Sequence, residues 1–393
     1  MTTLAGMALL VGALAQIEMR AGEVPPPGDV LAVSAEGVLI GFPPSQPGPQ
    51  AMGPMSPPVL IGWDRVREIS GVRSAEFEPF RTVAEKAWRA RVRVDRSDLA
   101  GAEPLLEELD ASYAGLHGPT AAMVGQSLLR CRLARGAQTL AIGPWLTWLG
   151  SGVIEGARPA SRGLRESHEQ TDEIEPVLLA PSPVALDPVT GLVPALPPIW
   201  LDGPGVQAFA RGAQPRPGGQ RGADDPGVAR ANAMAALFWQ SARFECGLDP
   251  GTFPPPGDDP GVLLVHQIVL ARAGEGSQRE QMRAQLRARI KARPEAWVEA
   301  WCRAGIGRSL LREDSAELRR LGVIELLHVP ARLADACPYL SGVTLAEASV
   351  ALKKLGDGAG AARLRQELVD TYAGHPALDW APLAAGPGAA ANQ

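Results

Sequence analysis

The sequence predicts a mainly α-helical protein, an α-solenoid of stacked helical hairpins with a small β-barrel at its N-terminus and long insertions rich in Pro and Gly. Three observations lead to this fold class. Apolar residues recur at helical spacing on both sides of short breaks, and they alternate at strand spacing near the N-terminus. The 44 Gly and 37 Pro residues gather in a few stretches. The 46% hydrophobic and 21% charged residues exclude a wholly disordered chain and a polytopic membrane protein.

The first fifteen residues predict a signal peptide, residues 1–15. They carry no charged side chain, are apolar from Leu4 to Leu14, and end in the small-x-small pattern Ala13-Leu14-Ala15. The apolar run is shorter than the roughly 20 residues that a membrane-spanning helix needs, so no transmembrane segment is expected. The usual basic start is missing, which leaves a buried N-terminal element and a cytoplasmic location open. We expect an exported protein of the periplasm or cell envelope.

Residues 16–71 predict the small β-barrel. Apolar residues alternate on both sides of residues 34–37, as in a β-hairpin, and residues 59–63 form a further apolar strand. Residues 41–58 between them hold seven prolines, which cannot pair in a sheet and therefore predict a loop. The order of hairpin, long loop and apolar strand ending in Trp-Asp-Arg-Val-Arg-Glu-Ile resembles an SH3-like or Sm-like barrel.

Helical periodicity begins at residue 81. Breaks in the periodicity at residues 97, 136, 274 and 356 each separate two apolar faces, so each predicts a helical hairpin. Residues 81–150 and 229–380 hold these hairpins. The first two breaks lie about 40 residues apart, a period typical of stacked helix pairs.

Residues 343–376 resemble a tetratricopeptide (TPR) repeat of the bacterial envelope type, as in the Tol-Pal coordinator. The resemblance rests on an alanine-rich helix, Leu-Gly-Asp, a basic helix and Tyr-x-Gly-His-Pro. It implies that Gly356 and Asp357 form the turn between helices, that Ala361 is the small residue where the helices touch, and that Pro376 starts the next helix. In the first hairpin Ser97 stands where glycine is usual.

Two stretches interrupt the helices. Residues 151–228 are rich in Pro and Gly and predict an irregular insert, because such a composition buries too little apolar surface to offset its ordering entropy. Within it, the apolar run 192–201 predicts an extended segment that docks on neighbouring helices. Residues 248–261 predict a long loop, and residues 381–393 a flexible tail.

No pattern in the sequence names a reaction. The four cysteines lie far apart without metal-ligand spacing, and each is interpreted as a small buried residue, with a Cys302–Cys337 bridge left open. His168-Glu169 begins like a zinc-protease motif, but Asp172 stands at the position of its second histidine. Nucleophile elbows, phosphate loops and dinucleotide fingerprints are missing. We therefore expect no catalytic residue, no metal and no cofactor.

Five residues are candidates for partner binding: Arg279, Arg283, Arg287, Trp297 and Trp301. The arginines form a basic flank on one helix, and the tryptophans stand at i and i+4, where a stacking platform is possible. The alternatives are a solvated face of a packing helix for the arginines and interhelical packing for the tryptophans.

These features predict a non-catalytic interaction protein that binds a protein or peptide partner in the groove of the helical stack, because stacked hairpins form long concave surfaces. The net charge of −5 opposes coating of phosphate backbones, so no nucleic acid is expected. Two alternatives remain. One is a hydrolase with a site between the insert and the helices, and the other is a nucleic-acid binder that uses the Arg-rich helix. The oligomeric state stays open.

Overall fold

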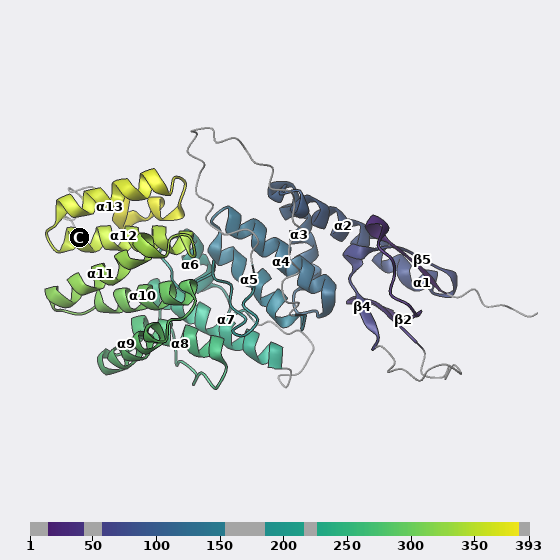
Figure 1. Cartoon of the computed structure of the whole chain (residues 1–393), viewed down its shortest axis with the longest axis horizontal. Helices are drawn as coiled ribbons and strands as arrows, with labels where there is room; N and C mark the ends of the chain where they lie inside the picture. Colours follow the sequence, from purple (N-terminus) through teal and green to yellow (C-terminus); the bar gives the residue numbers. More distant parts are fainter. Residues whose placement is uncertain (1–14, 43–56, 154–184, 216–225, 385–393) are drawn as a thin grey trace, which may run out of the picture.

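The computed structural model describes residues 15–42, 57–153, 185–215 and 226–384, and the protein is mainly helical with a small β region near its N-terminus (Figure 1). Figure 1 shows the β region at one end of an elongated molecule and helices α10 to α13 at the other. The predicted signal peptide, the prolines of 43–56 and the acidic part of the insert lie outside the described residues.

In the described part of the β region there are five short strands: β1 (Gln16–Met19), β2 (Asp29–Ser34), β3 (Gly37–Gly41), β4 (Val59–Ile61) and β5 (Val66–Ser70). They form two antiparallel sheets, β1–β5 and β2–β3–β4, rather than one continuous ladder. The predicted hairpin turn joins β2 to β3. Gly37 in it has φ +146°, and a Cβ there would stand 2.1 Å from the carbonyl oxygen of Ile61, so this position requires glycine.

Polar contacts fix the β region to the first helices. Trp63, which begins a 3-10 turn between β4 and β5, donates its indole N–H to the carbonyls of Ser34 and Ala35. The hydroxyl of Tyr113 donates to the same Ala35 carbonyl, and the Thr120 hydroxyl accepts the Trp63 backbone N–H at 3.0 Å. Because these groups are buried and paired, the β region and the helices behind it form one packed unit.

The helices before the insert begin with the single turn α1 (Ser74–Phe77), which packs on β5. The next four lie side by side in chain order: α2 (Arg81–Asp95), α3 (Leu99–Tyr113), α4 (Gly118–Ala134) and α5 (Gln138–Gly150). Those after the insert are α7 (Pro226–Glu245), α8 (Pro260–Ala273), α9 (Gly276–Lys291), α10 (Ala296–Leu310), α11 (Ala316–Arg332), α12 (Pro338–Lys354) and α13 (Gly358–Thr371). From α7 onward each helix again packs on the next. Second neighbours also touch, α2 on α4, α8 on α10 and α10 on α12.

Three of the predicted breaks share one backbone geometry. Ser97, Gly136 and Gly356 all have positive φ, at 60°, 74° and 88°. In each turn, this residue and the one after it donate backbone N–H groups to carbonyls of the preceding helix, with the same sequence offsets. This is the double hydrogen bond of a helix end closed by a left-handed residue. The break at Gly274 differs, because φ there is −66°.

The apolar run of the insert docks as predicted. Leu192, Val193, Leu196, Ile199 and Trp200 are buried in the largest core cluster, which also draws on α5, α7, α8, α10 and α12. The segment has neither helix nor strand, so its backbone groups need other partners. The docking segment, residues 191–200, is therefore part of the protein core rather than a covering loop.

Side chains of the surrounding helices bind the carbonyls of the docking segment. The indole N–H of Trp145 on α5 donates to the Gly191 carbonyl at 3.0 Å, and that of Trp301 on α10 donates to Pro194 at 3.1 Å. The final contacts come from the Ser241 hydroxyl on α7 to Pro198, and from the guanidinium of Arg308 on α10 to Trp200.

Two short helices form in stretches for which the composition predicts irregular structure. The insert is not irregular throughout, since α6 (Pro204–Arg211) forms within it, with Pro at its start and Gly212 after its end. The predicted tail begins with a short helix, α14 (Ala381–Ala384), anchored by the buried Leu383. In both places local capping and tertiary packing outweigh a composition that is typical of loops.

Candidate binding site

A pocket of about 690 Å³ opens beside the end of the docking segment, and we call it the insert pocket. Three stretches that are distant in sequence form its wall: the start of α5 (136–140), the chain from Trp200 into α6, and the 3-10 turn Pro376–Asp379 with Trp380. Tyr339 of α12 completes the lining. Figure 1 shows α6 lying between α5 and the C-terminal helices. A pocket of this volume is typical of binding sites for small molecules or side-chain anchors.

Most of the insert pocket is apolar. Leu140, Leu201, Val206 and Phe209 line it together with the aromatic rings already named. Leu140 is 51% exposed although it is a large hydrophobic side chain. The ring of Phe209 packs at a tilt against Trp200, with 6.5 Å between the ring centroids. The wall therefore offers aliphatic and aromatic surface to an apolar group.

Some polar atoms without partners belong to the same wall. The side-chain amide of Gln138 is buried, and neither its oxygen nor its nitrogen bonds to the described part of the chain. The indole Nε1 atoms of Trp200 and Trp380 are likewise buried and unpaired among the described residues. Buried polar groups are nearly always hydrogen-bonded, and an unpaired one costs about 1–3 kcal/mol.

The charged groups of the insert pocket are acidic. Asp202 and Asp379 lie on its rim with exposed side chains, and the described lining contains neither Arg nor Lys. Asp202 accepts a hydrogen bond from the amide of Gln207 at 2.9 Å, and neither carboxylate forms an ion pair within the described ranges. The rim therefore favours a cationic group on a ligand.

His375 connects two residues in the wall of the insert pocket. Its Nδ1 accepts the backbone N–H of Ala377 at 2.9 Å, so Nε2 carries the proton and donates it to the Tyr339 carbonyl, also at 2.9 Å. Its ring stacks on that of Tyr339. Burial lowers the pKa of His375 to about 4, because an imidazolium in this place would lose its hydration. The neutral ring thus joins two lining residues, Tyr339 and Ala377.

A buried ion network lies beneath the docking segment. Arg308, 2% exposed, donates from Nε to Glu347 of α12 at 2.9 Å and from Nη2 to the Trp200 carbonyl at 2.6 Å. Its Nη2 also lies 3.2 Å from the carboxylate of Glu245 of α7, which pairs with Arg272 of α8. Burial alone would raise the pKa of Glu245, but the two guanidinium groups outweigh it and lower this pKa. The network joins four helices to the segment.

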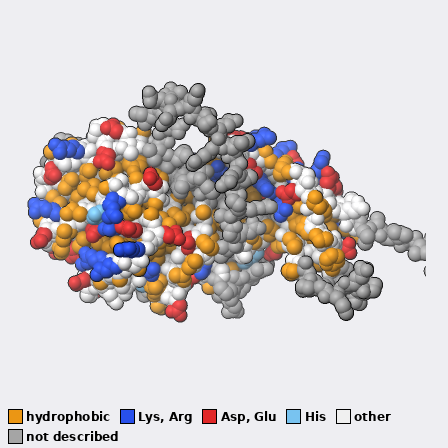
Figure 2. Space-filling view, in the orientation of Figure 1, with side chains coloured by type: hydrophobic (Ala, Val, Ile, Leu, Met, Phe, Trp, Pro, Cys, Tyr) orange, Lys and Arg blue, Asp and Glu red, His pale blue; other side chains and the backbone are white. Residues whose placement is uncertain are grey.

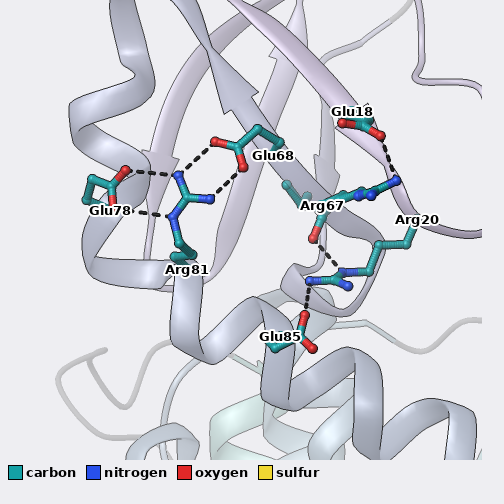
Figure 3. A network of polar contacts seen from close by, with 8 residues as sticks. Glu18, Arg20, Arg67, Glu68, Glu78, Arg81 and Glu85 are labelled. Carbon is teal, nitrogen blue, oxygen red and sulfur yellow. Dashed lines mark hydrogen bonds and ion pairs between the residues drawn. The ribbon is translucent and has the colours of Figure 1, made fainter.

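A second hollow, of about 880 Å³, lies over the β1–β5 sheet and α2, and we call it the N-terminal groove (Figure 3). Arg81 lies between Glu68 and Glu78, at 2.5 and 2.9 Å, and Arg67 pairs with Glu18 at 2.9 Å. The hydrogen bond from Arg81 lowers the pKa of Glu68. These carboxylates and guanidinium groups already neutralise one another.

Arg20 closes the N-terminal groove towards α2. Its Nη2 is 2.8 Å from Glu85, its Nε donates to the Val66 carbonyl, and its guanidinium lies 5.6 Å from the ring centre of Trp88. Figure 3 shows the Arg20 side chain reaching from the turn after β1 to Glu85 on α2. The paired charges of the groove therefore connect the β region to α2. Few of its polar groups are left to bond a ligand.

The predicted arginines do not form one exposed basic surface. Arg283 is buried and pairs with Glu313 at 2.6 Å, and Arg279 lies 3.4 Å from the same carboxylate. Arg287 is exposed. The basic flank of α9 is thus partly used in holding Glu313, which follows the end of α10.

The predicted tryptophan platform is also buried. Trp301 has no exposed surface and Trp297 is 6% exposed, and the two rings meet edge to face at 5.1 Å. The Trp301 N–H is bound to Pro194. Neither ring offers a face to a partner, because both belong to the core around the docking segment. The packing alternative agrees with this placement.

The residues of the predicted repeat turn lie at its helix junction. Gly356 takes the left-handed conformation, and Asp357 caps α13 by accepting the backbone N–H of Gly360. Ala361 is buried against α12, where its carbonyl accepts the Ser349 hydroxyl at 2.8 Å. Pro376 begins a 3-10 turn rather than a full helix.

The cysteines are free thiols, so Cys302 and Cys337 are not bridged. Burial raises the pKa of each of these two thiols to about 12, which makes them unreactive as thiolates near neutral pH. Across the described ranges, groups of His, Cys, Asp and Glu able to hold a metal ion are absent. Within the same ranges, each helix is too short or too polar to cross a bilayer.

Sequence reasoning did not identify the residues of the insert pocket, although the hydrolase alternative expects a site between the insert and the helices. Its key residues Gln138, Trp200 and Trp380 come from segments more than fifty residues apart, and none of them belongs to a motif. The only local signal is the density of aromatic residues at the two chain stretches that frame it. Comparison with known proteins adds no assignment: no protein-family model, no curated protein and no solved structure matches the chain.

Proposed function

We propose that this chain is a non-catalytic interaction protein of the bacterial cell envelope, in which a stack of TPR-like helical hairpins binds a protein or peptide partner. The repeated turn at Ser97, Gly136 and Gly356 supports the hairpin repeat, as does the packing of helices in chain order. The strand order, with a 3-10 turn between β4 and β5, supports an SH3-like N-terminal module.

The binding of the docking segment is the observation that carries this proposal. Four carbonyls of a Pro-rich segment without helix or strand are bound by indole, hydroxyl and guanidinium donors on α5, α7 and α10. Helical repeats bind extended ligands in the same manner, with side chains that reach the peptide backbone from successive helices. These helices thus hold a segment of their own chain, as the apolar run 192–201 predicts.

This occupancy changes where a partner fits. Residues 191–200 cover the face formed by α7, α10 and α12, so the proposed partner meets the surface that continues beyond Trp200. The insert pocket lies at that point. It also lies between the insert and the helices, where the hydrolase alternative expects a site, but His and Cys are lacking from its described lining.

The distribution of charge favours a protein partner over nucleic acid. On the face seen in Figure 2, basic and acidic side chains are interspersed among hydrophobic ones. Arg283, the most buried arginine of the basic flank, is neutralised by Glu313. Binding to a phosphate backbone needs many uncompensated cations at once.

The test is reconstitution of a complex. The full chain is immobilised, incubated with envelope extract at low and high salt, and the captured protein is identified, purified and titrated back. A saturable complex of fixed stoichiometry is expected. Failure to find such a partner at either salt contradicts the proposal. Retention on heparin that falls steeply with salt favours nucleic acid instead.

Location is tested separately. Fractionation followed by N-terminal sequencing is expected to give an envelope protein whose mature chain starts after Ala15. A chain that retains Met1 and stays in the cytosol contradicts export and leaves the binding proposal to the reconstitution experiment.

A further inference from the structure

We propose that the insert pocket binds an extended segment of the partner through an apolar or aromatic anchor side chain flanked by Lys or Arg, with partner backbone carbonyls accepting from the pocket's indole and amide groups. This inference rests on the proposed function and specifies its ligand. It follows from three properties of the pocket: the shape of its wall, its unpaired donors and the sign of its charge.

The apolar wall selects the anchor. Leu140, Val206 and Phe209 with the rings of Trp200 and Tyr339 enclose about 690 Å³, room for a large side chain and part of its backbone. Aromatic and large aliphatic anchors that fill such pockets carry most of the binding energy at protein interfaces. Exposed Leu140 lies at the entrance, where an incoming side chain covers it.

The unpaired donors select a peptide. Trp145 and Trp301 show how indole N–H groups act in this protein, because each binds a carbonyl of the docking segment. The equivalent atoms of Trp200 and Trp380 are buried without an acceptor among the described residues. Trp380 is partly exposed, so a side-chain rotation, a common adjustment at interfaces, brings its donor to a ligand carbonyl, whereas Trp200 is fixed in the core and contributes its ring. The Gln138 amide both donates and accepts, as a peptide group requires.

The rim selects the flanking charge. Asp202 and Asp379 are exposed acidic groups beside the pocket, and the described lining offers no cation to balance them. A Lys or Arg next to the anchor lies close to both carboxylates, whereas an acidic residue is repelled. Among ligands of equal apolarity, the acidic rim therefore favours those with a positive charge.

The experiment uses the full chain and a displayed library of random decapeptides. Selection is expected to enrich sequences with an aromatic or large aliphatic residue next to Lys or Arg. Leu140→Arg, which puts a cation at the entrance, is expected to weaken the enriched peptides by about tenfold or more. The matched control is Val189→Arg, an apolar residue outside the lining that is more exposed than Leu140, and it should leave binding unchanged.

Two further variants examine the donors and the rim. Trp380→Phe keeps the ring but removes the N–H, and a loss of about fivefold is expected, equivalent to one hydrogen bond. Trp239→Phe is its control, because the Trp239 N–H already donates to Gly212 outside the pocket. Asp202→Asn with Asp379→Asn should abolish the preference for basic over neutral peptides.

The outcomes separate this inference from the function on which it rests. Enriched peptides that are acidic, or that bind Leu140→Arg as well as wild type, overturn the inference. If the reconstituted partner still binds Leu140→Arg with full affinity, the interaction function stands and the insert pocket is not its site. If a neutral small molecule from the extract co-purifies in the pocket and blocks the peptides, the ligand class proposed here is wrong.

Discussion

The N-terminal groove and the insert pocket are hollows of similar size with opposite chemistry. In the groove, Arg20, Arg67 and Arg81 each have a carboxylate within 3 Å, and most of these side chains are exposed. In the pocket, Gln138 and two indole groups are buried and unpaired within the described chain. The groove is larger and more charged, yet its polar groups already bind one another. The difference teaches that unused bonding capacity, rather than size or charge, identifies a site for a ligand.

The largest loss of stability is expected in the buried ion network, because its charges are both paired and removed from water. Arg308→Met should lower the free energy of unfolding by about 3–5 kcal/mol, because it leaves Glu347 and the Trp200 carbonyl buried without a partner. Urea unfolding monitored by circular dichroism measures this loss. Arg287→Met, at an exposed position of α9, should change stability by no more than about 0.5 kcal/mol. Equal effects in the two variants would show that the network contributes nothing.

The wall of the pocket should respond to acid through His375. Its pKa is lowered to about 4 in the folded protein, against about 6.5 unfolded. Above pH 6.5 both states are neutral and stability is complete. As pH falls from 6.5 to 4 the unfolded state alone takes up the proton, so up to about 3 kcal/mol is lost. Unfolding of wild type and His375→Gln at pH 7 and 4.5 measures this. A wild-type profile as flat as that of the variant contradicts the buried neutral ring.

Removing an unpaired polar group should instead raise the free energy of unfolding. Gln138→Met is expected to stabilise the protein by about 1–2 kcal/mol while weakening peptide binding, because the amide costs free energy until a ligand pairs it. The control is Gln267→Met, since the Gln267 amide is buried but donates to Gln285 and accepts from Arg289. That variant should lose stability. Thermal unfolding of both variants measures these changes. A lower stability of Gln138→Met than of wild type would show that the Gln138 amide is not an unpaired group that costs free energy.

The smallest effect is expected in the N-terminal groove. Arg20→Met should cost about 1 kcal/mol, because it loses one ion pair and the bond to the Val66 carbonyl at a partly exposed site. The difference from wild type should shrink in 1 M salt, where exposed ion pairs are screened. Denaturation at low and high salt measures both numbers. A loss as large as that of Arg308→Met would mean that the groove, rather than the buried network, holds the fold together.

Local patterns in the sequence predict much of the fold. The breaks at 97, 136, 274 and 356 are all turns between helices, and the turn 34–37 joins two strands. These features depend on apolar periodicity and on residues that tolerate a left-handed backbone, both of which act over a few residues. Ser97 was recognised as standing in a glycine position, and its φ of 60° agrees. Helix α6 was missed, although Pro204 at its start and Gly212 after its end are ordinary boundary signals.

The candidate site depends on long-range packing, which no local pattern encodes. The spacing of Trp297 and Trp301 predicts either a stacking platform or interhelical packing. Both rings are buried in one core with the docking segment, whose position is set by donors on three helices. The same packing brings Gln138, Trp200 and Trp380 around one pocket. A sequence shows that a tryptophan has an N–H to satisfy. Only the fold shows whether an acceptor has been provided.

The docking segment also imposes an order on biosynthesis. The Pro194 carbonyl and its donor Trp301 are 107 residues apart in the sequence. The Trp200 carbonyl and its donor Arg308 are 108 residues apart. Until the ribosome has synthesised α10, the apolar residues of the docking segment lack part of the surface against which they pack. Nascent chains in that state are prone to aggregate. A chain terminated before α10 should therefore fail to accumulate as soluble protein, even though every residue of the segment is present.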